Sequence, residues 1–133
     1  MGSFCFIDKV AEVKRDQSVT AFFELKGNEE FLKDHFSEFP VMPGVLLLEV
    51  LKQAACVLLG QGGGGNGHSL YRLSEAGAVK FGKFVRPGST LKAFVRLVRK
   101  EKTSYCFEGR LDLERDGSPE GKALSAEFQL VPV

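Results

Sequence analysis

Apolar and polar residues alternate through much of the second half of the chain. In the stretch 89–100 the alternation sets Leu91, Ala93, Val95 and Leu97 against Lys92, Phe94, Arg96 and Val98. The stretch 103–114 repeats it, with Tyr105, Phe107, Leu111 and Leu113 against Cys106, Glu108, Arg110, Asp112 and Glu114. Because successive side chains of a strand point to opposite faces of a sheet, a period of two predicts antiparallel strands with one buried face. The pair Asp116-Gly117 predicts a hairpin turn.

The same criteria, applied to the whole chain, predict six strands and two helices. Strands are expected at 3–14, 18–26, 69–82, 89–100, 103–114 and 121–131. Asn28 suits the N-cap of a short helix that continues through Asp34. A longer helix is expected at roughly 44–59; its apolar residues are not confined to one stripe, so it should be buried nearly all round. The sheet must then curl around this helix. We therefore expect residues 1–133 to form a single α+β domain.

A glycine-rich segment, Gly60–Gly67, follows the long helix. It formally contains the pattern GxGxxG, at Gly60, Gly62 and Gly65. A dinucleotide-binding fingerprint has to follow a strand and open a helix, whereas this segment follows a helix. We therefore expect a flexible loop in which Gly60 serves as the C-terminal cap of the helix.

Composition narrows the classes of function. The net charge is only +1, which argues against a general nucleic-acid-binding protein. Cys5, Cys56 and Cys106 are widely spaced and form no CxxC pair, so we expect a reducing compartment and neither a disulfide framework nor a zinc site.

Residues 1–10 lack the basic start and long apolar core of a signal peptide. The longest apolar run, Val45–Leu59, contains charged residues and is short for a bilayer. We therefore expect a cytoplasmic protein without a membrane span.

Two side chains that can exchange protons flank a rigid turn. His35 precedes the sequence Pro-Val-Met-Pro-Gly at 40–44, and Glu49 follows it on the long helix. A neutral histidine can accept a proton near neutral pH. The leucines and valines next to Glu49 in sequence suit a carboxyl group that keeps its proton. The simpler alternatives are that His35 lies at the surface and that Glu49 only pairs with Lys52 or Gln53 on the helix.

The segment 31–53 resembles the signature of the 3-hydroxyacyl-(acyl carrier protein) dehydratases of the FabZ and FabA type. In that family a histidine, a Pro-Met-Pro-Gly turn and a helical acid occur in this order. The stretch KFGKFVRPGSTL at 80–91 resembles a second family segment, and Ala-Glu at 126–127 resembles its closing pair. Glu49 in place of aspartate, and Val45 in place of cysteine, resemble the FabZ-type enzymes more than the FabA-type dehydratase–isomerases. The resemblance implies the hot-dog fold, in which a curled six-stranded antiparallel sheet surrounds one long buried helix.

The resemblance also implies an activity, which is the loss of water from a (3R)-3-hydroxyacyl thioester to give the trans-2-enoyl thioester. The substrate would be carried on the phosphopantetheine of an acyl carrier protein, and no metal or redox cofactor would be needed. His35 would take the proton beside the carbonyl, and Glu49 would protonate the departing hydroxyl. The N–H groups of Gly44 and Val45 would bind the thioester oxygen and the substrate. In this family the histidine and the acid come from different subunits, which implies a homodimer or a trimer of dimers.

Three positions depart from the family pattern. Asp34 stands where glycine is usual before the histidine, Ser37 where proline is usual, and Ser89 where aspartate is usual. Asp34 could orient His35 by a hydrogen bond, or it could favour the charged imidazolium and so weaken a base. Two alternatives to the dehydratase therefore remain. One is a hot-dog acyl thioesterase, and the other is a catalytically weak, acyl-binding homologue that assembles with an active dehydratase.

Basic residues are concentrated between Lys80 and Lys102, where eight lysines and arginines are accompanied by one acid, Glu101. A solvated strand face is the simpler explanation. The alternative is a docking surface for an acidic carrier protein, which a positive field would attract. Lys80, Lys83 and Arg86 are the candidate contacts.

Overall fold

The computed structural model describes residues 6–26, 42–60 and 71–132. These residues form β1 (Lys9–Lys14), β2 (Ser18–Glu24), α2 (Gly44–Leu58), β3 (Tyr71–Phe81), β4 (Thr90–Lys100), β5 (Tyr105–Arg115) and β6 (Ser118–Pro132). The six strands make one antiparallel sheet in the order β1-β2-β4-β5-β6-β3. The short helix expected after Asn28 lies outside the described residues.

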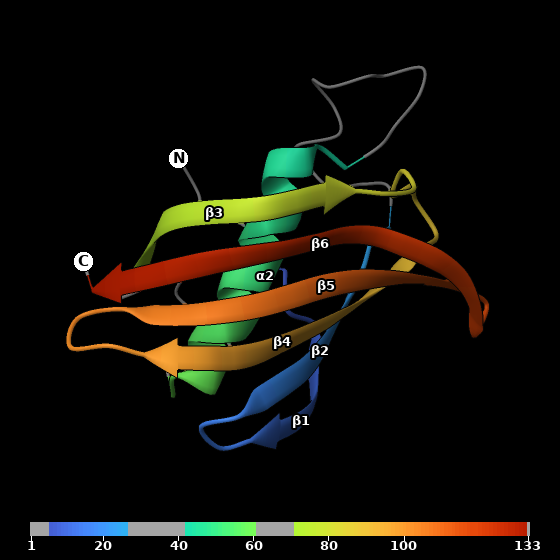
Figure 1. Cartoon of the computed structure of the whole chain (residues 1–133). Helices are drawn as coiled ribbons and strands as arrows, with labels where there is room; N and C mark the ends of the chain where they lie inside the picture. The colour runs from blue at the N-terminus through green and yellow to red at the C-terminus, as the bar shows by residue number, and fades with distance from the viewer. Residues whose placement is uncertain (1–5, 27–41, 61–70, 133) are drawn as a thin grey trace.

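Helix α2 lies against one face of the sheet, and the sheet curls around it (Figure 1). The strands that α2 contacts most extensively are β4, β2, β5 and β3. The buried side chains of the helix are Leu47, Val50, Leu51, Ala54, Ala55, Cys56 and Leu58. The sheet residues in the same core include Phe23, Leu91, Ala93, Val95, Phe107, Leu111 and Phe128. A curled antiparallel sheet around one long helix is the hot-dog fold, as predicted.

The alternation predicted for β4 and β5 is confirmed by burial. The buried residues of these two strands are Leu91, Ala93, Val95, Phe107, Gly109, Leu111 and Leu113. Gly109 has a specific packing role among them. A Cβ atom at this position would lie 3.0 Å from a methyl carbon of Leu51 and 3.1 Å from Cε1 of Phe128. The missing side chain therefore lets the helix approach the backbone of β5.

Each of the six strands differs from its predicted bounds by at least one residue, as β1, β2 and β6 illustrate. β1 begins at Lys9 rather than at residue 3, because the buried Phe6 leaves the sheet and enters the core. β2 ends at Glu24 rather than at 26. β6 begins at Ser118 rather than at 121, because strand pairing resumes directly after the hairpin turn. Pro119 is tolerated there because β3 pairs only with the later part of β6, which leaves this part at an edge of the sheet.

Both predicted glycine positions are confirmed. Asp116 and Gly117 join β5 to β6 with φ angles of 53° and 81°, as expected for a two-residue hairpin turn that matches the twist of its strands. Gly60 follows the helix with φ at 87°. Its N–H donates to the carbonyl oxygen of Val57 at 3.0 Å, so it ends the helix in the left-handed conformation that glycine favours.

Candidate active site

Helix α2 begins after a proline, and its first N–H groups have no acceptor within the helix; we call these N–H groups open. Pro43 is the N-cap residue, and the N–H groups of Leu46 and Leu47 donate to its carbonyl oxygen at 3.0 Å and 3.3 Å. The N–H groups of Gly44 and Val45 precede these bonds, so the helix itself offers them no acceptor. Together with the positive end of the helix dipole, they can bind an oxygen that gains negative charge.

An apolar pocket of about 400 Å³ opens beside this N-terminus. Its described lining is Met42, Pro43, Gly44, Val45, Leu47, Phe81, Gly82, Lys83, Phe84, Val85 and Ala123. Three large apolar side chains of the pocket are exposed: Val45 at 72%, Phe81 at 59% and Phe84 at 68%. The Phe81 ring lies so close to Gly44 that a Cβ atom there would be 2.7 Å from Cε1. A contiguous apolar surface of this kind indicates a binding site.

Glu49 lies farther along the same helix and has two polar neighbours. Gln53 Nε2 donates to Glu49 Oε2 at 3.1 Å, and Lys52 Nζ lies 3.9 Å from Oε1. Both pairings offered as the simpler alternative are therefore present, although 36% of the Glu49 side chain remains exposed. Its apolar sequence neighbours, such as Val50 and Leu51, point into the core from another face of the helix. The apolar enclosure expected from sequence is therefore not supplied by the described part of this chain.

His35 lies outside the described residues, as do Asp34 and Ser37. The distances from His35 to Glu49 and to the open N–H groups therefore stay predictions. The structure does place Gly44, Val45 and Glu49 on one helix, with the apolar pocket at its first turn.

A basic groove of about 920 Å³ adjoins the apolar pocket. Gly82, Lys83 and Phe84 line both hollows, which makes them neighbours on the surface. The charged residues in the described lining of the groove are Lys83, Arg86, Arg115 and Glu120. Lys80, the other predicted carrier contact, lies on β3 and is not among the described residues that line either hollow.

Arg115 is fixed at the wall of the groove. Its Nη2 donates to the carbonyl oxygen of Pro87 at 3.3 Å and to Ser89 Oγ at 3.2 Å. Its Nε lies 3.4 Å from Glu120 Oε2. Ser89 is buried, so the serine that replaces the usual aspartate keeps a polar partner inside the fold.

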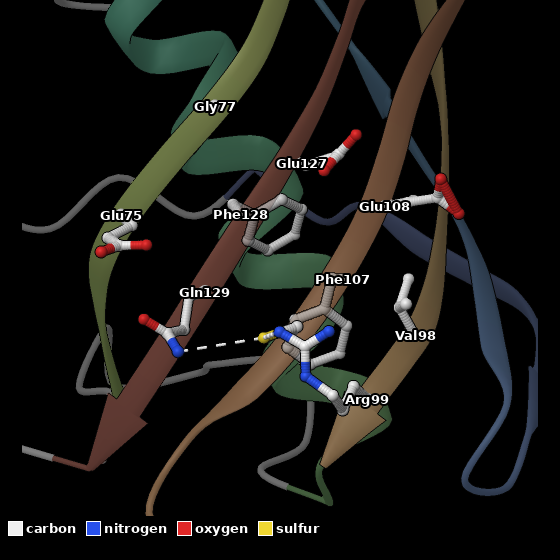
Figure 2. Close-up of a pocket in the computed structure, with 10 residues that line it drawn as sticks. Glu75, Gly77, Val98, Arg99, Phe107, Glu108, Glu127, Phe128 and Gln129 are labelled. Carbon is white, nitrogen blue, oxygen red and sulfur yellow. Dashed lines mark hydrogen bonds between the residues drawn. The ribbon is translucent and has the colours of Figure 1, made fainter. Parts of the chain in front are cut away.

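Two arginines of the basic stretch lie instead on the outer face of the sheet. Arg96 pairs with Glu108, and Arg99 Nε is 3.6 Å from Glu101. Figure 2 shows Arg99 at a shallow pocket of about 280 Å³ on this face, where its Nη2 lies 3.3 Å from the Cys106 sulfur. For these two arginines the solvated strand face is the better explanation.

The opposite end of α2 lies near a tyrosine pair. The rings of Tyr71 and Tyr105 meet edge to face, with centroids 5.6 Å apart. Burial raises the pKa of Tyr71, and the hydrogen bond with Tyr105 and the proximity of Cys56 raise it further. Tyr71 therefore keeps its proton at neutral pH, and this cluster contributes packing rather than acid–base chemistry.

Three residues of the pocket and the groove were not predicted as site residues from the sequence. Phe81 and Phe84 were recognised only as part of the family segment, although large apolar residues without a period of two were a usable signal. Arg115 gave no signal, because it reaches Ser89 only through the pairing of β4 with β5, in which Thr90 lies opposite Glu114.

Neither a membrane-spanning helix nor a metal cluster is found in the described ranges. None of the described helical residues forms a segment long and apolar enough to cross a bilayer. Three or more histidine, cysteine or acidic side chains do not converge anywhere within 6–26, 42–60 and 71–132.

These features define a hot-dog protein with a helical glutamate and an open helix N-terminus at an apolar pocket. A family model described as a FabA-like domain matches residues 1–118, and the chain belongs to that family. It is 40% identical over 94 residues to the 3-hydroxyacyl-(acyl-carrier-protein) dehydratase FabZ of Levilactobacillus brevis, covering 71% of this chain and 63% of that protein. It is 33% identical over 113 residues to the protein of the same name from Coxiella burnetii, covering 84% and 80%. The chain thus spans less than two thirds of the first of these relatives.

Solved structures agree on the fold. The dehydratase heterocomplex ApeI:P from Xenorhabdus doucetiae is similar with a TM-score of 0.73 at 18% identity, covering 96% of this chain and 82% of that one. An uncharacterized protein from Pyrococcus horikoshii is similar with a TM-score of 0.65 at 16% identity, covering 96% and 84%.

Proposed function

We propose that this protein removes water from a (3R)-3-hydroxyacyl thioester carried by acyl carrier protein, and so forms the trans-2-enoyl thioester. The observation that carries the proposal is the start of α2, where open N–H groups, an apolar pocket and a helical glutamate lie on one element. Membership of the FabA-like family and the similarity to proteins named as FabZ dehydratases support it.

Each part of the reaction has a proposed group. His35 accepts the proton from the carbon next to the thioester carbonyl, and the electrons of that bond form the new double bond. The bond from the neighbouring carbon to its hydroxyl breaks, and Glu49 supplies the proton that turns the hydroxyl into water. The N–H groups of Gly44 and Val45 hold the thioester oxygen while it carries negative charge. Proton exchange with solvent returns both side chains to their starting states.

A second subunit completes the proposed site. Glu49 has to carry a proton to act as the acid, yet in a single chain its side chain is partly exposed and lies near Lys52. A partner seated on the exposed Val45, Phe81 and Phe84 would remove water from this end of the helix. We therefore propose a homodimer in which His35 of one subunit works with Glu49 of the other, with a trimer of dimers as the larger assembly.

The basic groove is the proposed docking site for the acyl carrier protein. Lys83 and Arg86 lie in a hollow that continues into the apolar pocket. An acidic carrier that binds there would bring its phosphopantetheine arm to the start of α2. Charges at such a rim act mainly on encounter and specificity.

Incubation with a 3-hydroxyacyl carrier protein, followed by mass spectrometry of the carrier, tests the proposal. A loss of mass equal to one water supports the dehydratase. Release of the free acid would instead identify a thioesterase.

A catalytically weak homologue is the second candidate, and the contact between Lys52 and Glu49 favours it. In that case the carrier would be unchanged by this protein alone. Activity would appear only when an active dehydratase subunit is added.

A further inference from the structure

We propose that Gln53 positions Glu49, and that the backbone N–H of Phe6 decides which way the Gln53 amide faces. The inference rests on the proposed role of Glu49 as the acid. It assigns tasks to Gln53 and Phe6, for which the sequence alone predicts no role in the site, and it makes the two oxygens of the Glu49 carboxyl group unequal.

Gln53 connects two parts of the chain that are far apart in sequence. Its Oε1 accepts a hydrogen bond from the N–H of Phe6 at 2.6 Å. Its Nε2 donates to Glu49 Oε2 at 3.1 Å, one helical turn earlier. Both bonds are partly buried, so water competes with them less than at an open surface.

The direction of the amide follows from the chemistry of its partners. A backbone N–H can only donate, so the side-chain atom facing Phe6 has to be the amide oxygen. The NH₂ group is then left to face Glu49, and it can only donate. The N–H of Phe6 therefore fixes the orientation of the Gln53 amide, so that its NH₂ group donates to the carboxyl group.

As a consequence, the two oxygens of the Glu49 carboxyl group have different roles. Oε2 accepts from Gln53, and in a protonated carboxyl group the carbonyl oxygen is the better acceptor, so this arrangement favours Oε2 as the oxygen without the proton. The proton of the neutral acid belongs on Oε1. Lys52 Nζ, at 3.9 Å from Oε1, is beyond hydrogen-bond distance and leaves that oxygen available to a substrate hydroxyl.

Phe6, whose N–H binds Gln53, is held in place by its own packing and by the strand that follows it. The Phe6 ring is buried and packs edge to face on Phe23, with centroids 5.2 Å apart. Two residues later the N–H of Asp8 already donates to the carbonyl oxygen of Phe22 at 2.8 Å. The N–H of Phe6 is therefore directed to the helix rather than to the β1–β2 ladder, which is why this stretch is not part of the expected strand.

Gln53→Met is the primary test, because methionine fills similar space without either hydrogen bond. We expect kcat for dehydration to fall about tenfold or more, as for the loss of a hydrogen bond to a group that becomes charged as it gives up its proton, while KM changes little. Combined with Glu49→Gln, it should add no further loss, because residues that act as a unit are not additive. A kcat within twofold of the unchanged protein, or a fully additive double variant, would overturn the proposal.

Two variants of Phe6 separate its N–H from its ring. Phe6→Leu keeps the N–H and should retain kcat, whereas Phe6→Pro removes the N–H and should lower kcat as Gln53→Met does. Equal losses for leucine and proline would assign Phe6 to packing alone and would overturn its part in the proposal.

An NMR measurement keeps this inference separate from the proposed activity. The side-chain NH₂ signals of Gln53 should shift in Glu49→Gln, and hydrogen exchange at the Phe6 amide should accelerate in Gln53→Met. If Glu49→Gln keeps full activity, the acid assignment fails while these signals still report the contact. Unchanged signals in both variants would overturn the inference whatever the activity.

Discussion

The two ends of α2 are built for different purposes. Near its C-terminal end, Ala54 and Ala55 are fully buried and Leu58 nearly so. Near its start, Val45 is exposed and Glu49 is partly so, beside an apolar pocket. The same helix thus stabilises the fold with one end, and at the other it leaves apolar surface and N–H groups that have no acceptor within the helix. The candidate site therefore lies at the end of the helix where apolar side chains and an acid remain exposed in the described chain.

The largest expected effect is on activity at the open end. Glu49→Gln and His35→Ala should each lower dehydration by more than about a hundredfold, as expected for positioned acid–base groups. The thermal midpoint should stay close to that of the unchanged protein, because Glu49 is only partly buried. Turnover of 3-hydroxyacyl carrier protein and calorimetry measure the two quantities. Near-normal turnover in either variant would contradict its assignment.

At the packed part of the helix, a substitution is expected to lower stability rather than to act on the site directly. Leu51 is fully buried and contacts the backbone region of Gly109. Leu51→Ala should lower the free energy of unfolding by about 2–5 kcal/mol, because it removes apolar contacts and leaves a cavity. Denaturant titration measures the loss. Val45→Ala, on the exposed first turn, is the matched control and should cost far less in the isolated chain.

Mixed subunits test whether the open end is completed by a partner. When His35→Ala and Glu49→Gln subunits are exchanged, each heterodimer should regain roughly one intact site, because a closed two-fold interface places the two residues in shared sites. Activity should recover to about half of the unchanged dimer on this basis. Exchange proven by native mass spectrometry without any recovery would place both residues in a site of one subunit.

Charge reversal in the groove should have a smaller effect, confined to the carrier. Lys83→Glu with Arg86→Glu should raise KM several-fold for a carrier-bound substrate and weaken its salt dependence. A short pantetheine thioester should be affected much less. The matched control is Arg96→Glu with Arg99→Glu, on the outer face of the sheet. Equal losses on both substrates would assign Lys83 and Arg86 to the fold or the pocket.

The smallest effect is expected at the tyrosine pair. Burial raises the pKa of Tyr71 above its ordinary value, so the folded state holds the phenol proton more tightly than the unfolded state. This contribution to stability is present below about pH 10 and is lost as pH rises through the folded-state pKa. Tyr71→Phe should therefore flatten the decline of stability at alkaline pH. An unchanged decline would show that Tyr71 does not contribute to it.

Local chemistry explains which features were predictable from sequence. The period of two in β4 and β5, and the Asp-Gly turn between β5 and β6, are signals carried by adjacent residues. The predicted start of β1 was wrong because an apolar residue such as Phe6 fits a strand and a packed core equally well. The strand order, with β3 at one end of the sheet, depends on pairing across the chain.

The same contrast holds for the candidate site. Gly44 and Glu49 were found because the motif lies within one short segment. The described part of the chain does not supply the apolar enclosure expected for Glu49, because sequence neighbours on a helix point in different directions. Phe81 and Arg115 belong to the hollows only through contacts that the folded sheet creates, and such contacts leave little trace in a local pattern.

The strand β1 also bears on how these molecules behave when crowded together. It lies at one end of the described sheet with all of its residues exposed. Its register against β2 shifts between Val10 and Glu12, and lysines stand at both of its ends. A bulge and charged side chains interrupt the ladder that an incoming strand would need. This end of the sheet is therefore protected against open-ended strand addition, the route by which exposed edges lead to fibrous aggregates.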